Sequence, residues 1–359
     1  MAKPKRVKKS IFAKKPPRYL AALGLLSVSV LLAAFIITTS LVAANTQPGQ
    51  LGLGEVHSGQ NLRPSLDLSL AAKADYPSSA LQTVQDLGTD SGVDKQVVRF
   101  SVAADGLSEY ALLTKPAGAV PAHGYPAIIL CHGYVNPAQY QTDSGYLSDM
   151  DFYAKQGFLV VKPDLRGQGL STGQGLADSA YYSMSYNTDV MSLISSLKQT
   201  NYIDKDNLNL WGHSMGAYLA LRAAVISKDI KNVILLSGPV GSLNQIYLTY
   251  VPPSDENNPQ ALETRQAIFA KYGTPGEDSA FWQAASPTNY LAQTNAKFQI
   301  HSGALDNIVP PALSKELDDR LTSLKRAHEY YLYPNGLHSL IAQRDLIWSR
   351  SLKLMQTTQ

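Results

Sequence analysis

The sequence predicts an α/β fold in which a mostly parallel β-sheet carries helices on both faces. Two observations predict it. Short, wholly apolar runs recur along residues 96–355, and such runs are typical of strands that are covered on both faces. Stretches with helical periodicity separate most of these runs, and this alternation favours parallel pairing. In such sheets the chemistry gathers at the carboxyl ends of the strands, so the residues that follow each run are the candidates for function.

The first two runs of this region, residues 97–102 and 109–114, are predicted to form a hairpin. Ala104-Asp105-Gly106 between them suits the turn. Six further strands are expected at residues 127–131, 158–161, 207–211, 232–236, 298–300 and 329–333. Helical patterns are expected at residues 142–156, 186–199, 214–227, 311–325 and 338–353.

The N-terminal residues predict a membrane anchor. Residues 1–19 hold eight Lys or Arg and no acid, and residues 20–44 hold no charged side chain. A helix of this length would extend about 37 Å, enough to cross about 30 Å of hydrocarbon. Basic flanks resist translocation, so residues 1–19 are expected in the cytoplasm and the following domain on the other side. A signal peptide cleaved after Val42-Ala43-Ala44, which would give a secreted protein, is the alternative.

Charge and cysteine content exclude several classes of protein. The formal net charge is +3, but residues 1–19 account for it, because the rest carries 23 basic against 28 acidic residues. That sign disfavours a nucleic-acid-binding domain. The only cysteine, Cys131, excludes an intramolecular disulfide and a Cys-rich metal site. The chain also shows no phosphate loop or complete dinucleotide fingerprint, so we expect neither a metal nor a cofactor.

Gly212-His213-Ser214-Met215-Gly216 fits the pattern G-x-S-x-G. It directly follows the predicted strand at 207–211 and directly precedes a helical run, which is the context that this motif requires. A turn this tight needs glycine where a larger side chain would collide with the backbone. Ser214 would then project above the sheet edge, beside the positive end of the helix dipole. The pattern therefore predicts a nucleophilic serine, with a helix-capping serine as the alternative.

A serine hydroxyl needs a base, and His338 is the candidate. It follows the last predicted strand, in Pro334-Asn335-Gly336-Leu337-His338, and so belongs to the same sheet edge as Ser214. Asp306, after the strand at 298–300, would orient the imidazole. The chain order Ser214, Asp306, His338 is the one expected of such hydrolases. Asp164 is the competing acid, but it precedes the serine, and we expect it to anchor its own loop with Arg166 as a candidate partner.

Two backbone N–H groups are candidates for binding the oxyanion of a tetrahedral intermediate. One belongs to Met215, at the start of the helix after the serine. The other belongs to Tyr134, in the loop that follows the strand at 127–131. Cys131 is a weak alternative nucleophile, because it closes a buried apolar strand and is expected to be an inert packing thiol.

Two segments depart from the strand–helix alternation. Residues 45–95 are predicted to be an extracytoplasmic linker, because Gln, Gly, Ser, Pro and Asp are frequent there, although the alternation of Leu66, Leu68 and Leu70 fits a short strand. Residues 242–290 form an insert above the edge that carries the serine. The insert is a candidate lid over an apolar pocket, with a surface-packed excursion as the alternative. Its aromatic residues are Tyr247, Tyr250, Phe269, Tyr272, Phe281, Trp282 and Tyr290.

Residues 96–355 resemble an α/β-hydrolase, and most of all the catalytic domain of the prolyl oligopeptidase family. The serine motif is joined by four further matches. They are Leu130-Cys131-His132-Gly133, Pro163-Asp164-Leu165-Arg166-Gly167-Gln168-Gly169, Ser286-Pro287-Thr288-Asn289-Tyr290, and His301-Ser302-Gly303 with Asp306-Asn307-Ile308-Val309-Pro310 before His338. The resemblance implies a Ser214–His338–Asp306 triad.

The resemblance implies a serine hydrolase, but the chain departs from the family in two ways. Members usually carry a β-propeller before the catalytic domain, and residues 45–95 are too few for one. The serine motif is also His-Ser-Met, a form that many esterases and lipases share. We therefore expect a membrane-anchored serine hydrolase that cleaves peptide (amide) or ester bonds in a short peptide or small ester. The resemblance implies a peptidase of the prolyl oligopeptidase type, with a carboxylesterase or lipase-like acyl hydrolase as the alternative. A catalytically silent binding protein is a further alternative.

Overall fold

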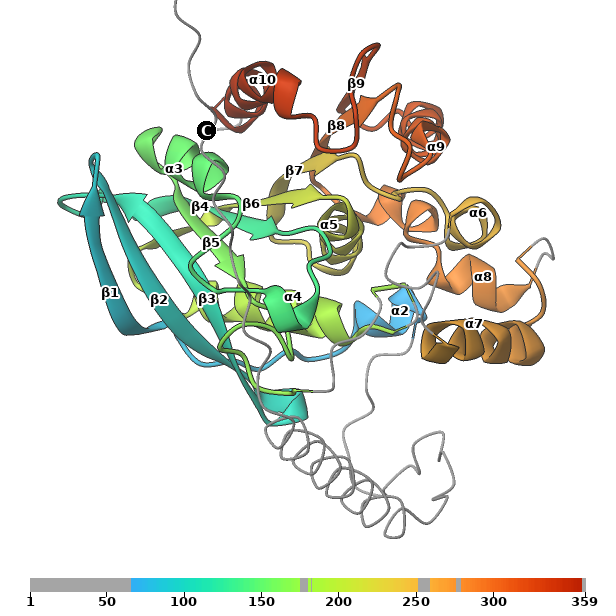
Figure 1. The fold of residues 1–359 in the computed structure, drawn as a ribbon, viewed down its shortest axis with the longest axis horizontal. Helices are drawn as coiled ribbons and strands as arrows, with labels where there is room; N and C mark the ends of the chain where they lie inside the picture. Colours follow the sequence, from blue (N-terminus) through green and yellow to red (C-terminus); the bar gives the residue numbers. More distant parts are fainter. Residues whose placement is uncertain (1–65, 175–179, 182, 251–258, 276–278, 357–359) are drawn as a thin grey trace, which may run out of the picture. The chain divides into compact units, whose positions relative to one another are not determined.

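The computed structural model describes a nine-stranded sheet and the helices that cover it (Figure 1). The strand order among the described residues is β1-β2-β3-β5-β4-β6-β7-β8-β9. The basic tail at 1–19 and the predicted anchor at 20–44 lie outside the described residues. The described ranges are 66–174, 180–181, 183–250, 259–275 and 279–356.

The parallel part of the sheet matches the predicted strands. Every pairing from β5 through β4 to β9 is parallel, and each strand lies within a few residues of its predicted range. The carboxyl ends of these strands therefore lie at one sheet edge. The strands are β4 (Tyr125–Cys131), β5 (Leu159–Pro163), β6 (Ile203–His213), β7 (Ile230–Leu236), β8 (Lys297–Gly303) and β9 (His328–Tyr333).

An antiparallel group completes the sheet beyond β5. β2 (Val93–Val102) pairs with β3 (Leu107–Pro116), as expected for a hairpin, and Gly106 in the turn adopts the left-handed conformation. β3 pairs antiparallel with β5. β1 (Gln82–Asp90) pairs with β2 at the outer edge of the sheet. The predicted fold class is thus confirmed as an α/β fold with a mostly parallel sheet.

The structured domain begins before residue 96, which corrects the predicted linker boundary. β1 lies inside the range 45–95, and every one of its nine residues is exposed, so it has no apolar pattern to reveal it. Backbone hydrogen bonds to β2 hold it instead. Residues 68–71 form the short helix α2 (Leu68–Ala71) rather than a strand, because Asp67 caps it by accepting hydrogen bonds from the backbone N–H groups of Ser69 and Leu70.

Helices cover both faces of the sheet. The buried cluster on one face includes residues of α4 (Ser185–Lys198), α5 (Met215–Ile226) and α9 (Pro311–Ser323). The cluster on the opposite face includes residues of α3 (Leu147–Lys155) and α10 (Arg344–Gln356). The predicted helix at 338–353 starts later, at Arg344, because the preceding residues form a loop and a 3-10 turn.

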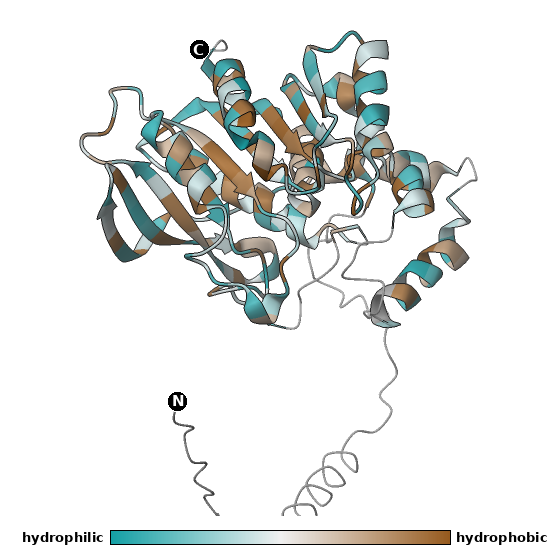
Figure 2. Cartoon of the chain, turned by 45° about the horizontal axis from the view of Figure 1, so that its top comes forward, coloured by the Kyte–Doolittle hydropathy of each residue, from teal (hydrophilic) through white to brown (hydrophobic). Residues whose placement is uncertain are grey.

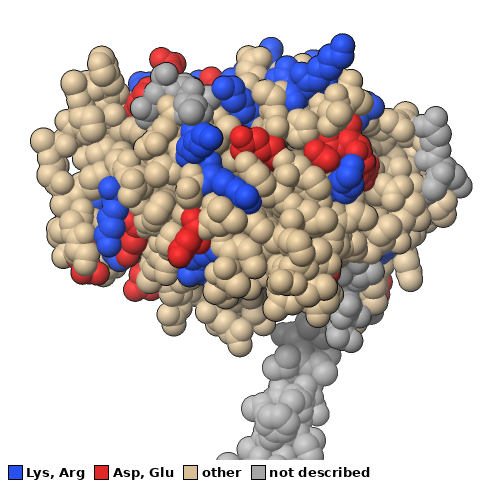
Figure 3. Space-filling model, turned by 90° about the horizontal axis from the view of Figure 1, so that it is seen from above, with Lys and Arg blue, Asp and Glu red and all other residues tan. Residues whose placement is uncertain are grey.

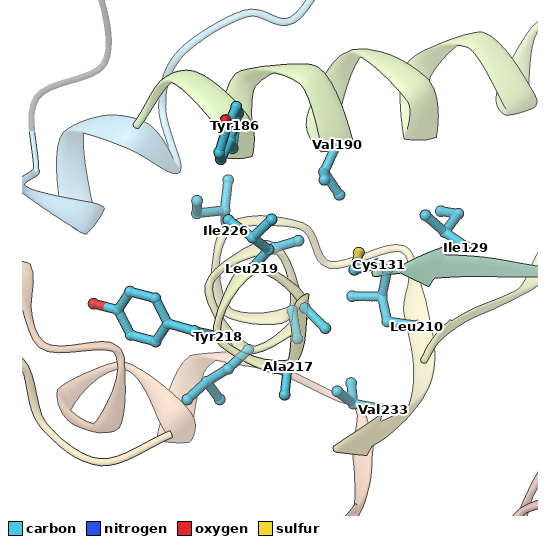
Figure 4. Close-up of a cluster of buried hydrophobic side chains, with 14 of the residues drawn as sticks. Ile129, Cys131, Tyr186, Val190, Leu210, Ala217, Tyr218, Leu219, Ile226 and Val233 are labelled. Carbon is cyan, nitrogen blue, oxygen red and sulfur yellow. The ribbon is translucent and has the colours of Figure 1, made fainter. Parts of the chain in front are cut away.

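The core explains why the strand sequences are wholly apolar. Alternate residues point to opposite faces, so Ile129 and Cys131 pack against α5 while Ile128 and Leu130 pack on the other side. Every residue of α5 is buried, and Figure 4 shows side chains of this helix between α4 and the side chains of β4, β6 and β7. The apolar strands lie at the centre of Figure 2, between more polar helices. α5 is therefore a rigid support for the residue that precedes it.

The insert holds three described helices. They are α6 (Leu243–Thr249), α7 (Pro259–Tyr272) and α8 (Ala280–Ala285), which lie beside one another in Figure 1. On the face of the molecule seen in Figure 3, Lys and Arg side chains are interspersed with Asp and Glu among larger uncharged areas. Over the described ranges, no helix combines the length and the apolar character that a membrane crossing needs.

Candidate functional site

Ser214 occupies a strained turn between β6 and α5. β6 ends at His213, α5 begins at Met215, and Ser214 between them has φ 54° and ψ −124°. A positive φ is uncommon for a residue other than glycine and costs about 1–3 kcal/mol. The backbone N–H of Ser214 donates to the carbonyl of Leu236 on β7 at 2.9 Å. The turn thus places the hydroxyl at the carboxyl end of β6.

Two glycines are required for this turn. A Cβ atom on Gly212 would lie 2.4 Å from the carbonyl oxygen of Gly216. A Cβ atom on Gly216 would lie 1.9 Å from the carbonyl oxygen of Cys131 on β4. Both distances are far shorter than any van der Waals contact, so the backbone leaves no room for a side chain. The spacing of the G-x-S-x-G pattern therefore has a steric cause here.

His338 lies between Ser214 and Asp306 and contacts both. Its Nε2 atom is 2.9 Å from the Ser214 hydroxyl, and its Nδ1 atom is 2.9 Å from Oδ2 of Asp306. The two loops that carry His338 and Asp306 are joined by a backbone hydrogen bond from Leu305 to Gly336. A carboxylate only accepts hydrogen bonds, so Nδ1 carries the proton and Nε2 is left to accept from the serine. The structure thus brings together the three residues expected of a triad.

Asp306 is held as a carboxylate. Its side chain is buried, and its Oδ1 atom accepts from the backbone N–H groups of Ile308 and Val309, each at 2.9 Å. Desolvation alone would raise the pKa of Asp306. The hydrogen bonds from His338 and from the two amides outweigh it, so the pKa lies below its ordinary value. Asp306 is therefore charged wherever His338 needs a negative partner.

Asp164 lies in a different network. It accepts hydrogen bonds from the Thr142 hydroxyl and from the backbone N–H of Leu170, and burial raises its pKa to about 6. These contacts anchor the loop, as expected. The predicted pairing of Asp164 with Arg166 was wrong, however, because Arg166 forms a buried ion pair with Asp189. The Nε atom of Arg166 lies 3.0 Å from Oδ1 of Asp189.

The predicted oxyanion donors belong to the residue after Ser214 and to the loop after β4. Met215 is the first residue of α5, and its N–H is one of the amides that a helix leaves without an intrahelical acceptor. Tyr134 follows Gly133, and a Cβ atom on Gly133 would lie only 3.3 Å from the Ser214 Cβ atom. The loop after β4 therefore approaches the serine. The role of the Tyr134 and Met215 amides stays a prediction.

Two further histidines and the cysteine, all at or near the ends of strands, are buried in unreactive forms. Burial holds the pKa of His132 and of His301 at about 3, so both rings are neutral. The ring of His301 contacts Tyr333 and Gln299. Burial raises the pKa of the Cys131 thiol to about 12, so no thiolate forms at neutral pH.

The aromatic residues of the insert contact one another. The rings of Tyr247 and Trp282 have centroids 5.1 Å apart, and Phe269 lies 6.2 Å from Trp282. Tyr272 and Phe281 stack at 3.8 Å. Tyr247 and Trp282 are buried members of the core cluster. These contacts attach the described part of the insert to the core, and the lid role stays a prediction.

Two side chains next to the serine carried little signal in the sequence. His213 belongs to the serine motif only as its variable position, and its ring hydrogen-bonds Tyr146 and the backbone carbonyl of His338. Tyr146 belongs to no motif, and nothing in its neighbourhood in the sequence points to the site. Its position directly before α3, at the sheet edge, becomes visible only in the fold.

The sequence matches the prolyl oligopeptidase family over residues 145–355, which is more than half of the chain. The chain belongs to this family. Among its curated relatives, the probable dipeptidyl-aminopeptidase B of Talaromyces marneffei is 21% identical over 246 residues, covering 67% of this chain and 25% of the relative. The corresponding protein of Emericella nidulans is 22% identical over 249 residues, with the same coverage. The chain thus spans about a quarter of the length of these relatives.

Solved structures support the α/β-hydrolase fold. Acetyl xylan esterase 1 from Thermoanaerobacterium superposes with a TM-score of 0.58 at 18% identity, over 82% of this chain and 96% of that one. Dipeptidyl peptidase 4 of Porphyromonas gingivalis superposes with a TM-score of 0.55 at 16% identity, over 80% of this chain and 36% of that one. At these identities the likeness concerns the fold alone.

Proposed function

We propose that this member of the prolyl oligopeptidase family is a serine hydrolase whose nucleophile is Ser214. The observation that carries the proposal is the continuous contact from the Ser214 hydroxyl through His338 to Asp306. His338 takes the hydroxyl proton as Ser214 attacks a carbonyl carbon, and then returns it to the leaving group. Asp306 holds the imidazole in the required tautomer and stabilises its charged form.

The tetrahedral oxyanion is proposed to bind the backbone N–H groups of Met215 and Tyr134. The N-terminus of α5 supports this role, because it directs unpaired N–H groups and the positive end of the helix dipole at the serine. The close approach of Gly133 to Ser214 supports the second donor. Water then hydrolyses the acyl-enzyme by the same route.

The proposed substrate is a short peptide, cleaved at an amide bond. Membership of a peptidase family supports this class. A small ester is the second candidate, and the specific observation in its favour is the His213-Ser214-Met215 sequence, which resembles that of many esterases. Ester hydrolysis demands less of the leaving-group proton transfer, so the two classes separate on substrates that share an acyl group.

The test uses the full-length protein with matched p-nitroanilide and p-nitrophenyl ester substrates. A fluorophosphonate probe first counts competent sites, and the labelled peptide is identified by mass spectrometry. The proposal expects labelling of Ser214 and turnover of at least one substrate class, with Ser214→Ala inactive on both. A folded wild-type protein that neither reacts with the probe nor turns over any substrate would make it a silent binding protein.

The protein is further proposed to be anchored in a membrane, with residues 1–19 in the cytoplasm and the catalytic domain outside. The support is the uncharged run at 20–44 beside eight basic residues. Secretion after cleavage behind Ala44 is the alternative. A hydrolase placed this way would act on substrates that reach the outer face of the membrane.

A further inference from the structure

A second histidine, His213, bridges the loops that surround the serine. Its Nδ1 atom lies 2.9 Å from the Tyr146 hydroxyl, and its Nε2 atom lies 3.1 Å from the backbone carbonyl oxygen of His338. The same Tyr146 hydroxyl lies 2.9 Å from the backbone N–H of Gly133. One side chain at the end of β6 is therefore connected both to the loop of the proposed base and to the loop after β4.

The direction of each hydrogen bond in this bridge is fixed. A carbonyl oxygen only accepts, so Nε2 of His213 donates to His338. In the neutral ring Nδ1 then accepts, and its donor is the Tyr146 hydroxyl. The Tyr146 oxygen in turn accepts from the Gly133 N–H. Donors and acceptors thus match along the whole path, and no polar group in it is left without a partner of the right kind.

The surroundings keep the His213 ring neutral, as this pattern requires. Burial and, to a smaller extent, the nearby His338 lower its pKa to about 4. The two rings have centroids 5.1 Å apart. A charged His213 would oppose the positive charge that His338 acquires when it takes the serine proton. A neutral donor to the backbone of His338 has no such effect.

Gly133, Tyr146 and His213 converge on Ser214. A Cβ atom on Gly133 would lie 3.0 Å from the Tyr146 hydroxyl, 3.2 Å from Nδ1 of His213 and 3.3 Å from the Ser214 Cβ atom. Tyr146 reaches this point from a left-handed backbone conformation with φ 59°. Such strain at a residue other than glycine persists only where surrounding contacts impose it. The four residues therefore form one tightly packed unit.

We propose that His213 and Tyr146 are positioning residues, which hold the loop of His338 and the loop of Gly133 in register with Ser214. This inference rests on the proposed function and adds two residues to it. Each acts through the backbone of a neighbouring loop, His213 through that of His338 and Tyr146 through that of Gly133. The bridge also occupies the Gly133 N–H, so Tyr134 supplies the oxyanion donor from this loop. A misplacement of about 1 Å in such a site can cost 100-fold in rate.

Matched substitutions separate the two halves of the bridge. Gln at position 213 extends an N–H toward the position of Nε2 and retains the donor to His338. Asn retains an acceptor near the position of Nδ1 for Tyr146. Tyr146→Phe removes only the hydroxyl. We expect His213→Ala and Tyr146→Phe to lower kcat per titrated site by about 10- to 100-fold with KM within threefold, and His213→Gln and His213→Asn each to recover part of the loss.

His328 provides the control. It also uses both ring nitrogens, toward Asp318 and the Arg326 carbonyl, but it lies at the opposite end of β9 from the site. His328→Gln and His328→Asn are expected to leave kcat unchanged. Kinetics, phosphonate titre and melting temperature are measured for all variants. If the His213 and Tyr146 variants keep kcat per titrated site within twofold of the wild type, the inference is overturned. In that case a wild type that is labelled and active still supports the proposed function.

Discussion

Asp306→Asn tests how the triad is oriented. The substitution preserves the shape of the side chain, and its oxygen can still accept from the amides of Ile308 and Val309, so the loop should keep its conformation. Its NH₂ group, however, replaces Oδ2, which lies 2.9 Å from Nδ1 of His338. Two donors cannot face each other. Nδ1 must therefore lose its proton, and the neutral ring then carries the proton on Nε2.

That change of tautomer removes the base, because a protonated Nε2 cannot accept from the Ser214 hydroxyl 2.9 Å away. The corresponding change in a serine protease lowers turnover about 10⁴-fold. At 1.36 kcal/mol for each factor of ten, this corresponds to about 5 kcal/mol of lost transition-state stabilisation. We expect a loss of that order in kcat, with a small change in melting temperature.

Asp164→Asn is the matched control. Asp164 contacts Thr142 and Leu170 rather than His338, so its substitution should lower the melting temperature while turnover per folded molecule stays within a few-fold of wild type. Both variants would be measured by thermal unfolding and by turnover of the substrate that the wild type prefers. If Asp164→Asn is folded and inactive while Asp306→Asn turns over normally, the assigned acid is wrong.

Three further predictions concern stability and topology. Between about pH 3 and 6.5 the unfolded state protonates His301 and the folded state does not, so this residue makes stability fall with acidification. In His301→Gln the free energy of unfolding should therefore fall less steeply, by about 1.4 kcal/mol per pH unit or about 2 kcal/mol between pH 6.5 and 4.5. Denaturant titrations measure it, and identical pH slopes for the variant and the wild type would refute this. Gly216→Ala should abolish either the soluble folded protein or its reaction with the phosphonate probe, because the added Cβ atom would overlap the Cys131 carbonyl. A normal melting temperature together with a normal phosphonate titre would contradict the steric argument. A Ser58→Cys variant that also carries Cys131→Ala should react with an impermeant maleimide on intact cells, and protection until lysis would reverse the proposed topology.

The parallel strands and the three contacting residues could be predicted because their signals are local. A strand buried on both faces is apolar throughout, and the G-x-S-x-G pattern reflects the overlap that any side chain at Gly212 or Gly216 would cause. Ser214, Asp306 and His338 then meet because each follows a parallel strand, and these strands end at a common edge.

The features that were missed depend on contacts between distant residues. β1 is exposed on both sides and is held by backbone pairing, so its sequence resembles a linker. Arg166 pairs with Asp189, which is 23 residues away, rather than with the acid beside it. The hydroxyl of Tyr146 meets His213 across 67 residues. No local pattern records such pairs, and only the packing of α3 and α4 against the sheet brings them together.

Turnover by Ser214→Ala tests the central claim most directly. The hydroxyl of Ser214 is the only group of the proposed triad that bonds to substrate, and losing such a nucleophile typically costs about 10⁶-fold in rate. The purified variant should melt like the wild type, bind no phosphonate and show turnover at the background of the assay. Retention of more than about a hundredth of wild-type turnover in a homogeneous preparation would remove Ser214 from the mechanism.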